Sequence, residues 1–254
     1  MRLKTIVLII LCLLLGVGFV VWKSQTADAP SFRPESNKTT PAAVKPKPFD
    51  KTMYSLTNPA SVWVIANKQH PLGPKEYVPA DLVVPNVSLR VPGNESMQLR
   101  QVAAGALETM FSAAKSDGIA MTLSSGYRSY TYQVNLYNGY VASQGQVAAD
   151  TQSARPGFSE HQTGLAVDVE PSDRTCEVEA CFGGTPAGVW VKAHAYEYGF
   201  IIRYPTGKED ITGYEPEPWH LRYIGKDLAF ELNRTGVTTL EEFFGISGGK
   251  SYVD

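Results

Sequence analysis

The chain contains the stretch Ser159-Glu-His-Gln-Thr-Gly-Leu-Ala-Val-Asp-Val-Glu170, in which a carboxylate stands inside an apolar segment. Residues 165–169 predict a short strand, because they are mostly aliphatic and follow a glycine turn. Asp168 then lies in a buried strand, where an ionised group without a partner costs several kcal/mol. We therefore expect Asp168 to meet a cation, a set of hydrogen-bond donors or a metal ion.

A second stretch downstream, Glu215-Pro-Glu-Pro-Trp-His-Leu-Arg222, sets Glu217 and His220 three positions apart. Together with His161 and Asp168, His220 completes two imidazoles and one carboxylate, the ligand set of a catalytic zinc ion with its fourth position open to water. Glu217 is then the natural general base. In a regular strand, positions three apart face opposite sides, so a shared site requires a bulge or turn before Trp219.

Outward from these two stretches, helices and strands alternate without a repeating βαβ period, which favours one α+β domain. Asn94 is expected to cap the first helix, and residues 71–92 are expected to be irregular cover. The chain has no internal repeat. The predicted strands are 62–65, 119–123, 165–169, 200–204 and 219–224, and the predicted helices are 95–116, 129–143, 145–154, 187–198, 226–233 and 239–244.

The net charge of −2 over 254 residues hides two different regions. Residues 1–50 hold seven Lys or Arg against three Asp or Glu, a net of +4, and residues 51–254 hold sixteen against twenty-two, a net of −6. An acidic domain without a Lys/Arg run argues against nucleic acid as a partner, because phosphate binding needs clustered positive charge.

The basic end begins with Arg2 and Lys4, and an apolar run follows as far as Trp22. Residues 1–23 therefore predict a signal peptide or membrane anchor, with residues 5–22 in contact with the membrane. A small-x-small cleavage pattern at 27–29 keeps both alternatives open. Residues 24–50 are proline-rich and predict a flexible tether. The domain 51–254 is then expected outside the cytoplasm, in the cell envelope.

Two cysteines, Cys176 and Cys181, lie in an acidic, glycine-rich stretch. In an exported protein, cysteines this close are expected to form a disulfide. A metal pair is the weaker alternative, since no second Cys or His pair stands at zinc-finger spacing. Glu170, Glu177 and Glu179 are most simply interpreted as part of a solvated acidic loop.

The motifs above occur together with Ser125-Gly-Tyr-Arg-Ser129, Asn67-Lys-Gln-His-Pro-Leu72 and Tyr198-Gly-Phe-Ile-Ile-Arg-Tyr-Pro205. In this combination the chain resembles the zinc D-alanyl-D-alanine carboxypeptidases of the VanY type and their L,D-carboxypeptidase relatives, over roughly residues 63–244. The resemblance implies a small central antiparallel sheet that is flanked by helices and holds the zinc site.

By matching positions, the resemblance also implies roles for single residues and one Zn²⁺ per chain. His161, Asp168 and His220 match the metal ligands, Glu217 the catalytic base, and Arg128 the arginine that stabilises the tetrahedral intermediate. The substrate is then a peptidoglycan stem peptide, and the protein a monomer. The expected substrate contacts are Gln133 and Ser153, Ser159 near the terminal carboxylate with Arg155 as a second candidate, and Trp219.

Two rival functions come from other classes. A non-catalytic module that binds cell-wall peptides on the same fold is disfavoured, because all three ligands and the base are present. A cysteine hydrolase is disfavoured because Cys176 and Cys181 have no histidine near them in sequence. The pattern leaves open whether the substrate is a pentapeptide ending in D-Ala-D-Ala or a tetrapeptide ending in one D-Ala.

Overall fold

The computed structural model describes residues 48–253, which belong to one compact unit. The predicted signal peptide or anchor and nearly all of the predicted tether lie outside the described residues. Within the described part of the chain, no helix has both the length and the apolar character needed to cross a membrane.

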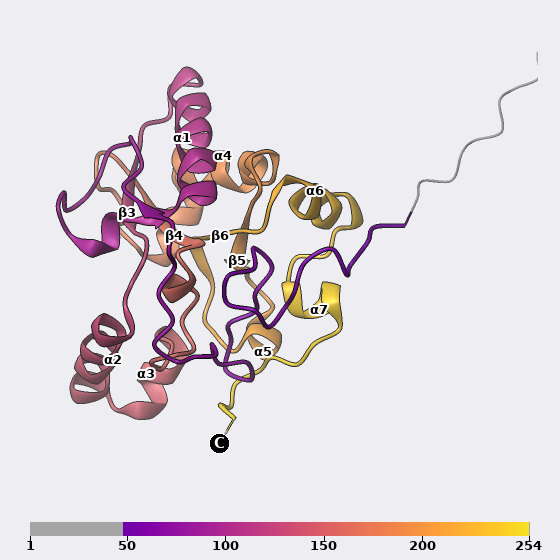
Figure 1. Ribbon diagram of the computed structural model, residues 1–254. Helices are drawn as coiled ribbons and strands as arrows, with labels where there is room; N and C mark the ends of the chain where they lie inside the picture. Colours follow the sequence, from indigo (N-terminus) through magenta and orange to yellow (C-terminus); the bar gives the residue numbers. More distant parts are fainter. Residues whose placement is uncertain (1–47, 254) are drawn as a thin grey trace, which may run out of the picture. The chain divides into compact units, whose positions relative to one another are not determined.

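The centre of the domain is a four-stranded antiparallel sheet with the strand order β3-β4-β6-β5. Its strands are β3 (Met121–Ser125), β4 (Ala166–Pro171), β5 (Phe200–Tyr204) and β6 (Glu217–Tyr223). Figure 1 shows helices on both sides of this sheet. The α+β class and the central antiparallel sheet are confirmed.

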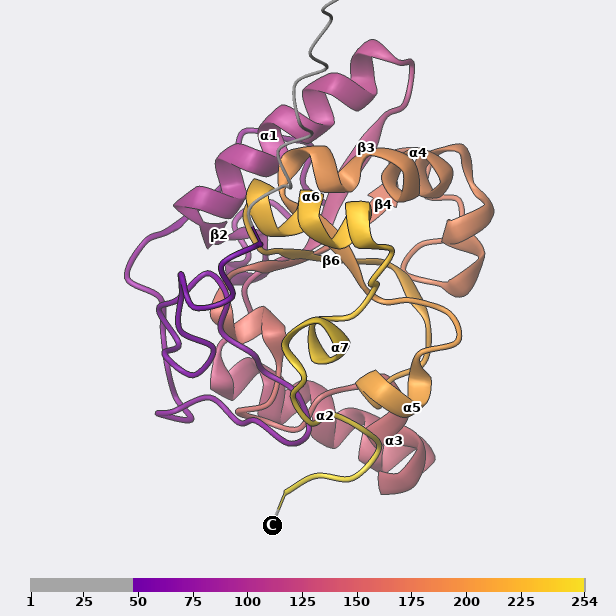
Figure 2. The ribbon, with the colours of Figure 1, turned by 90° about the vertical axis from the view of Figure 1, so that its right-hand side faces the viewer.

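The two faces of the sheet differ in chemistry because side chains alternate along each strand. Val167, Val169 and Leu221 belong to the main apolar core, which also includes residues of α1 (Gln101–Ser116) and α4 (Pro186–His194). Asp168 lies directly opposite His220 in the strand register and faces the other side. The helices α2 (Tyr130–Gln144) and α3 (Gln146–Gln152) lie below the sheet in both ribbon views (Figures 1 and 2).

The remaining elements are short or peripheral. A second apolar cluster joins Trp63 and Ile65 to α6 and α7. The other elements are β1 (Leu82–Val83), β2 (Leu99–Arg100), α5 (Glu209–Thr212), α6 (Lys226–Thr235), α7 (Leu240–Phe244) and the 3-10 helices Glu95–Met97, Glu160–Thr163, Ala180–Gly184 and Ala195–Tyr198.

The predicted strand at 62–65 is wrong. This segment is buried, but it is a turn followed by irregular chain. The Arg222 guanidinium donates hydrogen bonds to the carbonyl oxygens of Val62 and Val64, at 3.0 and 2.7 Å. A side chain thus satisfies backbone groups that a neighbouring strand would otherwise have to satisfy.

The predicted start of the first helix is also wrong. Asn94 does cap a helix, but that helix is the single 3-10 turn Glu95–Met97. Leu99 and Arg100 then pair with β1, and α1 begins only at Gln101. Leu99 is fully buried, and its pairing with Val83 keeps the chain extended there.

The bulge that Glu217 and His220 require is present in β6. Ile202 pairs with Leu221, and Tyr204 pairs with Glu217. An advance of two residues along β5 therefore corresponds to an advance of four residues along β6. Two extra residues are therefore accommodated between Glu217 and Leu221, and the strand bends there.

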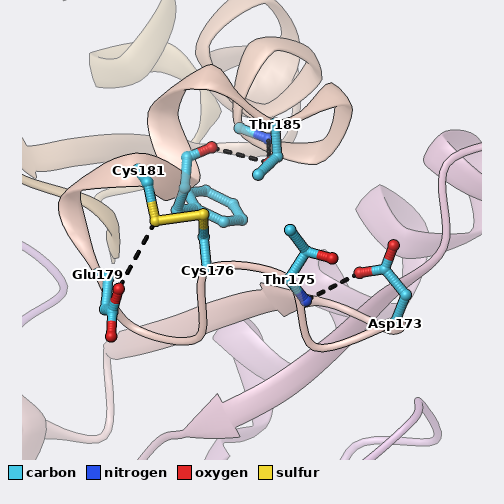
Figure 3. Close-up of a disulfide and its surroundings, with 8 residues drawn as sticks. Asp173, Thr175, Cys176, Glu179, Cys181 and Thr185 are labelled. Carbon is cyan, nitrogen blue, oxygen red and sulfur yellow. Dashed lines mark hydrogen bonds between the residues drawn. A yellow bond between two sulfur atoms is a disulfide. The ribbon is translucent and has the colours of Figure 1, made fainter.

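A disulfide between Cys176 and Cys181 closes the loop after β4 (Figure 3). The loop holds three non-glycine residues at positive φ, namely Arg174, Cys176 and Val178, a conformation that costs on the order of 1 kcal/mol each and needs support. Arg90 supplies further support, because it pairs with Glu177 and, at 2.9 Å, with Glu170. Glu170 is only 1% exposed, so its interpretation as part of a solvated loop is wrong.

Replacing both cysteines with serine is expected to lower the free energy of unfolding by about 2 kcal/mol, since the six-residue ring restrains the unfolded chain. For a domain of this size the melting temperature should fall by roughly 4–8 °C. Urea denaturation and thermal melts of the oxidised parent, the reduced parent and the double variant measure the effect. The reduced parent should match the variant, and equal stability of all three would contradict the prediction.

Candidate active site

His161, Asp168 and His220 meet on the polar face of the sheet, each buried to at least 95% of its area. Their ligand atoms all lie within 4.8 Å of one another. His161 comes from the 3-10 helix Glu160–Thr163, Asp168 from β4 and His220 from β6. Nε2 of His161 is 3.3 Å from one Asp168 oxygen, and Nδ1 of His220 is 3.1 Å from the other.

Each imidazole presents one nitrogen to the centre of this group, and the opposite nitrogen faces another acceptor. Nδ1 of His161 is 2.6 Å from the carbonyl oxygen of Gly126, so it donates its proton there and leaves Nε2 as a lone pair. For His220 the roles are reversed, because Nε2 faces Glu160 at 3.6 Å and Nδ1 faces Asp168. A hydrogen bond on the outer nitrogen, as His161 makes to Gly126, is typical of histidines that bind metals.

The donor set fits a metal cation. Asp168 Oδ1 is buried and has no hydrogen-bond partner within the described chain, although His220 Nδ1 is close. The two atoms are near each other without hydrogen-bond geometry, as expected for atoms that point at a common centre. Burial disfavours the charged forms, yet the neighbouring histidines hold the pKa of Asp168 well below its usual range, so the carboxylate is ionised. Burial and Arg128 lower the pKa of His161 to about 4, which leaves it neutral. Burial alone would also lower the pKa of His220, but Asp168 and Glu160 raise it to about 9.

Glu217 lies beside these three residues but is not a member of the candidate ligand set. Its Oε2 is 3.5 Å from Nδ1 of His220, and its side chain is 14% exposed. Burial raises the pKa of Glu217 to about 7, against a smaller opposing effect of His220. A carboxylate with this pKa exchanges protons readily near neutral pH, as a general base must.

Arg128 reaches the same group from the segment between β3 and α2. Its Nη2 donates to Asp168 Oδ2 at 2.9 Å and to Nε2 of His161 at 2.6 Å. Its Nε donates to Ser125 Oγ at 3.1 Å. Asp168 therefore has a cationic partner, one of the alternatives that its buried position predicted, and Arg128 lies within reach of the site.

A cleft of about 1150 Å³ opens over these side chains. Its walls come from α2, the segment 152–161, the disulfide loop, the end of β5 and β6. Tyr204, which the sequence did not single out, lies in this wall, and its ring centroid is 4.9 Å from that of His220. The predicted site residues in the lining are Arg128, Gln133, Ser153, Ser159, His161, Asp168, Glu217, Trp219 and His220.

Gln133 and Ser153 lie together in the cleft lining. The Gln133 amide donates to Ser153 Oγ at 3.2 Å and to the Ala154 carbonyl at 2.8 Å. Arg155 is not in the cleft lining, and its guanidinium pairs with Asp150 at 2.7 Å. The structure thus brings the predicted substrate contacts to the cleft with the exception of Arg155.

A buried ionic network behind His220 was missed by the sequence analysis. Glu160 Oε1 accepts from Arg203 and Arg222, each at 2.8 Å, and Arg203 also pairs with Glu241 at 2.6 Å. Burial alone would raise the pKa of Glu160, but the two arginines hold it below its usual range. The signal was present, because Arg203 and Arg222 are charged residues inside predicted strands, as Asp168 is.

Comparison with known proteins gives a consistent picture. The model of the VanY family, described as D-alanyl-D-alanine carboxypeptidase, matches residues 96–226. The chain is 46% identical over 193 residues to YodJ of Bacillus subtilis (strain 168), a protein assigned to the carboxypeptidases, and the match covers 76% of this chain and 70% of YodJ.

Solved structures agree with the sequence match. The LdcB LD-carboxypeptidase is 45% identical, with a TM-score of 0.70 over 74% of this chain and 88% of that one. A mutant of the vancomycin resistance D,D-pentapeptidase VanY, in complex with Zn(II), is 32% identical, with a TM-score of 0.55 over 71% of this chain and 97% of that one. The chain therefore belongs to the VanY family and is a metallo-carboxypeptidase.

Proposed function

We propose that this protein is a zinc-dependent carboxypeptidase that removes a C-terminal D-alanine from peptidoglycan stem peptides. The observation that carries the proposal is the convergence of His161, Asp168 and His220, whose ligand atoms lie within 4.8 Å of one another beside a carboxylate with a raised pKa. Two imidazoles and one carboxylate suit Zn²⁺, with one ion per chain. The Zn(II) complex of a relative supports this choice of metal.

The reaction is hydrolysis of the last amide bond of the stem. When bound, zinc acts as a Lewis acid and lowers the pKa of a coordinated water from about 15.7 to about 7. Glu217, 3.5 Å from His220, accepts a proton from the attacking water as a new C–O bond forms at the carbonyl carbon. It then donates that proton to the leaving nitrogen as the C–N bond breaks, so that D-alanine departs as an amine.

Arg128 stabilises the charge that develops on the carbonyl oxygen. It lines the cleft beside the ligand residues, and its guanidinium stays protonated throughout. In the lining of the cleft, Ser153 and Ser159 offer hydroxyl donors for the terminal carboxylate, and Gln133, whose amide donates to Ser153 Oγ and the Ala154 carbonyl, holds Ser153 in place. Trp219 supplies apolar wall area near the stem.

Two observations bear on the substrate and location. Identity to the LD-carboxypeptidase LdcB is 45%, against 32% for the D,D-pentapeptidase, which favours a tetrapeptide ending in one D-alanine as the substrate.

The apolar run between Lys4 and Lys23 supports action outside the cytoplasm, in the cell envelope, with the N-terminal segment at the membrane. We infer that the enzyme works there as a monomer.

Tetrapeptide and pentapeptide stems, incubated with the full chain and weighed by mass spectrometry, test the proposal. We expect the tetrapeptide to lose one D-alanine, a chelator to stop the reaction, and added zinc to restore it. A chain that binds no zinc, or one that cleaves equally well with chelator present, would overturn the proposal. Peptide binding without release of D-alanine would favour the rival cell-wall-binding module.

Glu217→Gln should lower kcat by about 100- to 10,000-fold, because the amide cannot take the proton of the attacking water. Zinc content should stay at one ion per chain, since Glu217 is not a ligand in the proposed site. Glu215→Gln is the matched control, because Glu215 lines the same cleft but is exposed. The role of Glu217 is refuted if its variant turns over as fast as the control.

Arg128→Gln should lower kcat by roughly 100- to 1000-fold, with a smaller change in KM, because its charge is needed most in the transition state. Steady-state kinetics on the tetrapeptide measure both parameters. Arg234→Gln serves as control, since Arg234 is exposed on α6 and pairs with Glu231 there. A rise in KM at constant kcat would instead make Arg128 a ground-state binding residue.

A further inference from the structure

We propose that Glu160 is a positioning residue that holds the imidazole of His220 so that Nδ1 faces the metal. The inference rests on the proposed zinc site. It assigns a role to a buried carboxylate that the reaction itself does not use. Glu160 is 2% exposed and precedes His161 in the chain.

The first step is the contact between Glu160 and His220. Glu160 Oε2 lies 3.6 Å from Nε2 of His220, and within residues 48–253 neither atom has a hydrogen-bond partner inside 3.5 Å. Both atoms are buried, and an unsatisfied buried donor or acceptor is costly. With the Nε2–H of His220 directed at the acceptor that Glu160 offers, Nδ1, 3.1 Å from Asp168 Oδ1, is the nitrogen left for the metal ion.

The second step is the way in which Glu160 is held. Its other oxygen, Oε1, accepts from Nε of Arg203 and from Nη1 of Arg222, both at 2.8 Å. The side chains of Glu160, Arg203 and Arg222 are all fully buried. One oxygen is thus occupied by two guanidinium groups, and the other is left for His220.

The third step is the anchoring of the two arginines. Arg222 also donates to the Val64 carbonyl at 2.7 Å, and Arg203 pairs with Glu241 on α7. Two carboxylates balance two guanidinium groups, so the network is formally neutral with His220 uncharged, the form in which an imidazole binds a metal. His220 is therefore positioned by a rigid network that extends from α7 to the segment before Ala66.

The test compares two buried carboxylates of one network in the full chain. Glu160→Gln removes the charged acceptor of His220, and Glu241→Gln breaks the network at Arg203, away from His220. Zinc affinity is measured by competition with a chelator, and the ligand field by the visible spectrum of the Co²⁺-loaded protein. Thermal melts of the metal-free proteins report the loss of stability separately.

We expect Glu160→Gln to weaken zinc binding about 10- to 100-fold and to change the Co²⁺ spectrum. Glu241→Gln should lower the melting temperature but change zinc affinity less than about 3-fold, since it does not touch His220. Unchanged zinc affinity in Glu160→Gln overturns the inference. Equal weakening in both variants also overturns it, because the effect would then be one of general stability.

If Glu160→Gln does not fold, Glu160→Asp takes its place, because it keeps the charge for the arginines but is one methylene shorter. It should weaken zinc binding in the same range, and parental affinity would overturn the inference. Failure of the parent itself to bind zinc would instead refute the proposed function, so the two failures are distinguishable.

Discussion

The burial of a carboxylate on one face of the central sheet is the constraint on which the rest of the structure depends. Asp168 is 3% exposed and lies opposite His220 in the strand register. An ionised group in that position needs compensating charge, because its desolvation costs several kcal/mol. Arg128 compensates it in front, and the network of Glu160, Glu241 and their two arginines supports the site from behind. The apolar face of the same strands carries the core, so one sheet serves packing on one side and chemistry on the other.

The same constraint explains which parts of the site could be predicted from the sequence. Asp168 stood out because a charged residue inside an apolar strand needs a partner that stabilises its charge. The stretches around His161 and His220 indicated that this partner is a metal site. The environment of Glu217 followed from the period of a strand, which required the bulge that β6 contains. These inferences depend on local spacing, which a sequence displays directly.

What the sequence could not reveal are the partners that its charged side chains find in the folded chain. Residues 62–65 have the composition of a strand, but Arg222, about 160 positions later, satisfies their carbonyl groups. Arg155 looked like an anchor for a terminal carboxylate, yet Asp150, five positions before it, takes its guanidinium. Glu160 pairs with Arg203 and Arg222 from 43 and 62 positions away. Arg203 and Arg222 were visible as charges within predicted strands, but the identity of their partners depends on the folded chain.

The disulfide loop has a consequence for proteolysis. Between Cys176 and Cys181 the chain is exposed at Glu179 and Ala180, and exposed loop tips are preferred sites for protease nicking. A cut there leaves both new ends joined through the sulfur atoms, since the bond encloses the cut. Gly183 would still pack against Pro218, and the wall of the cleft would keep its covalent connection to β4 and α4. A single cut between Cys176 and Cys181 therefore does not separate the chain.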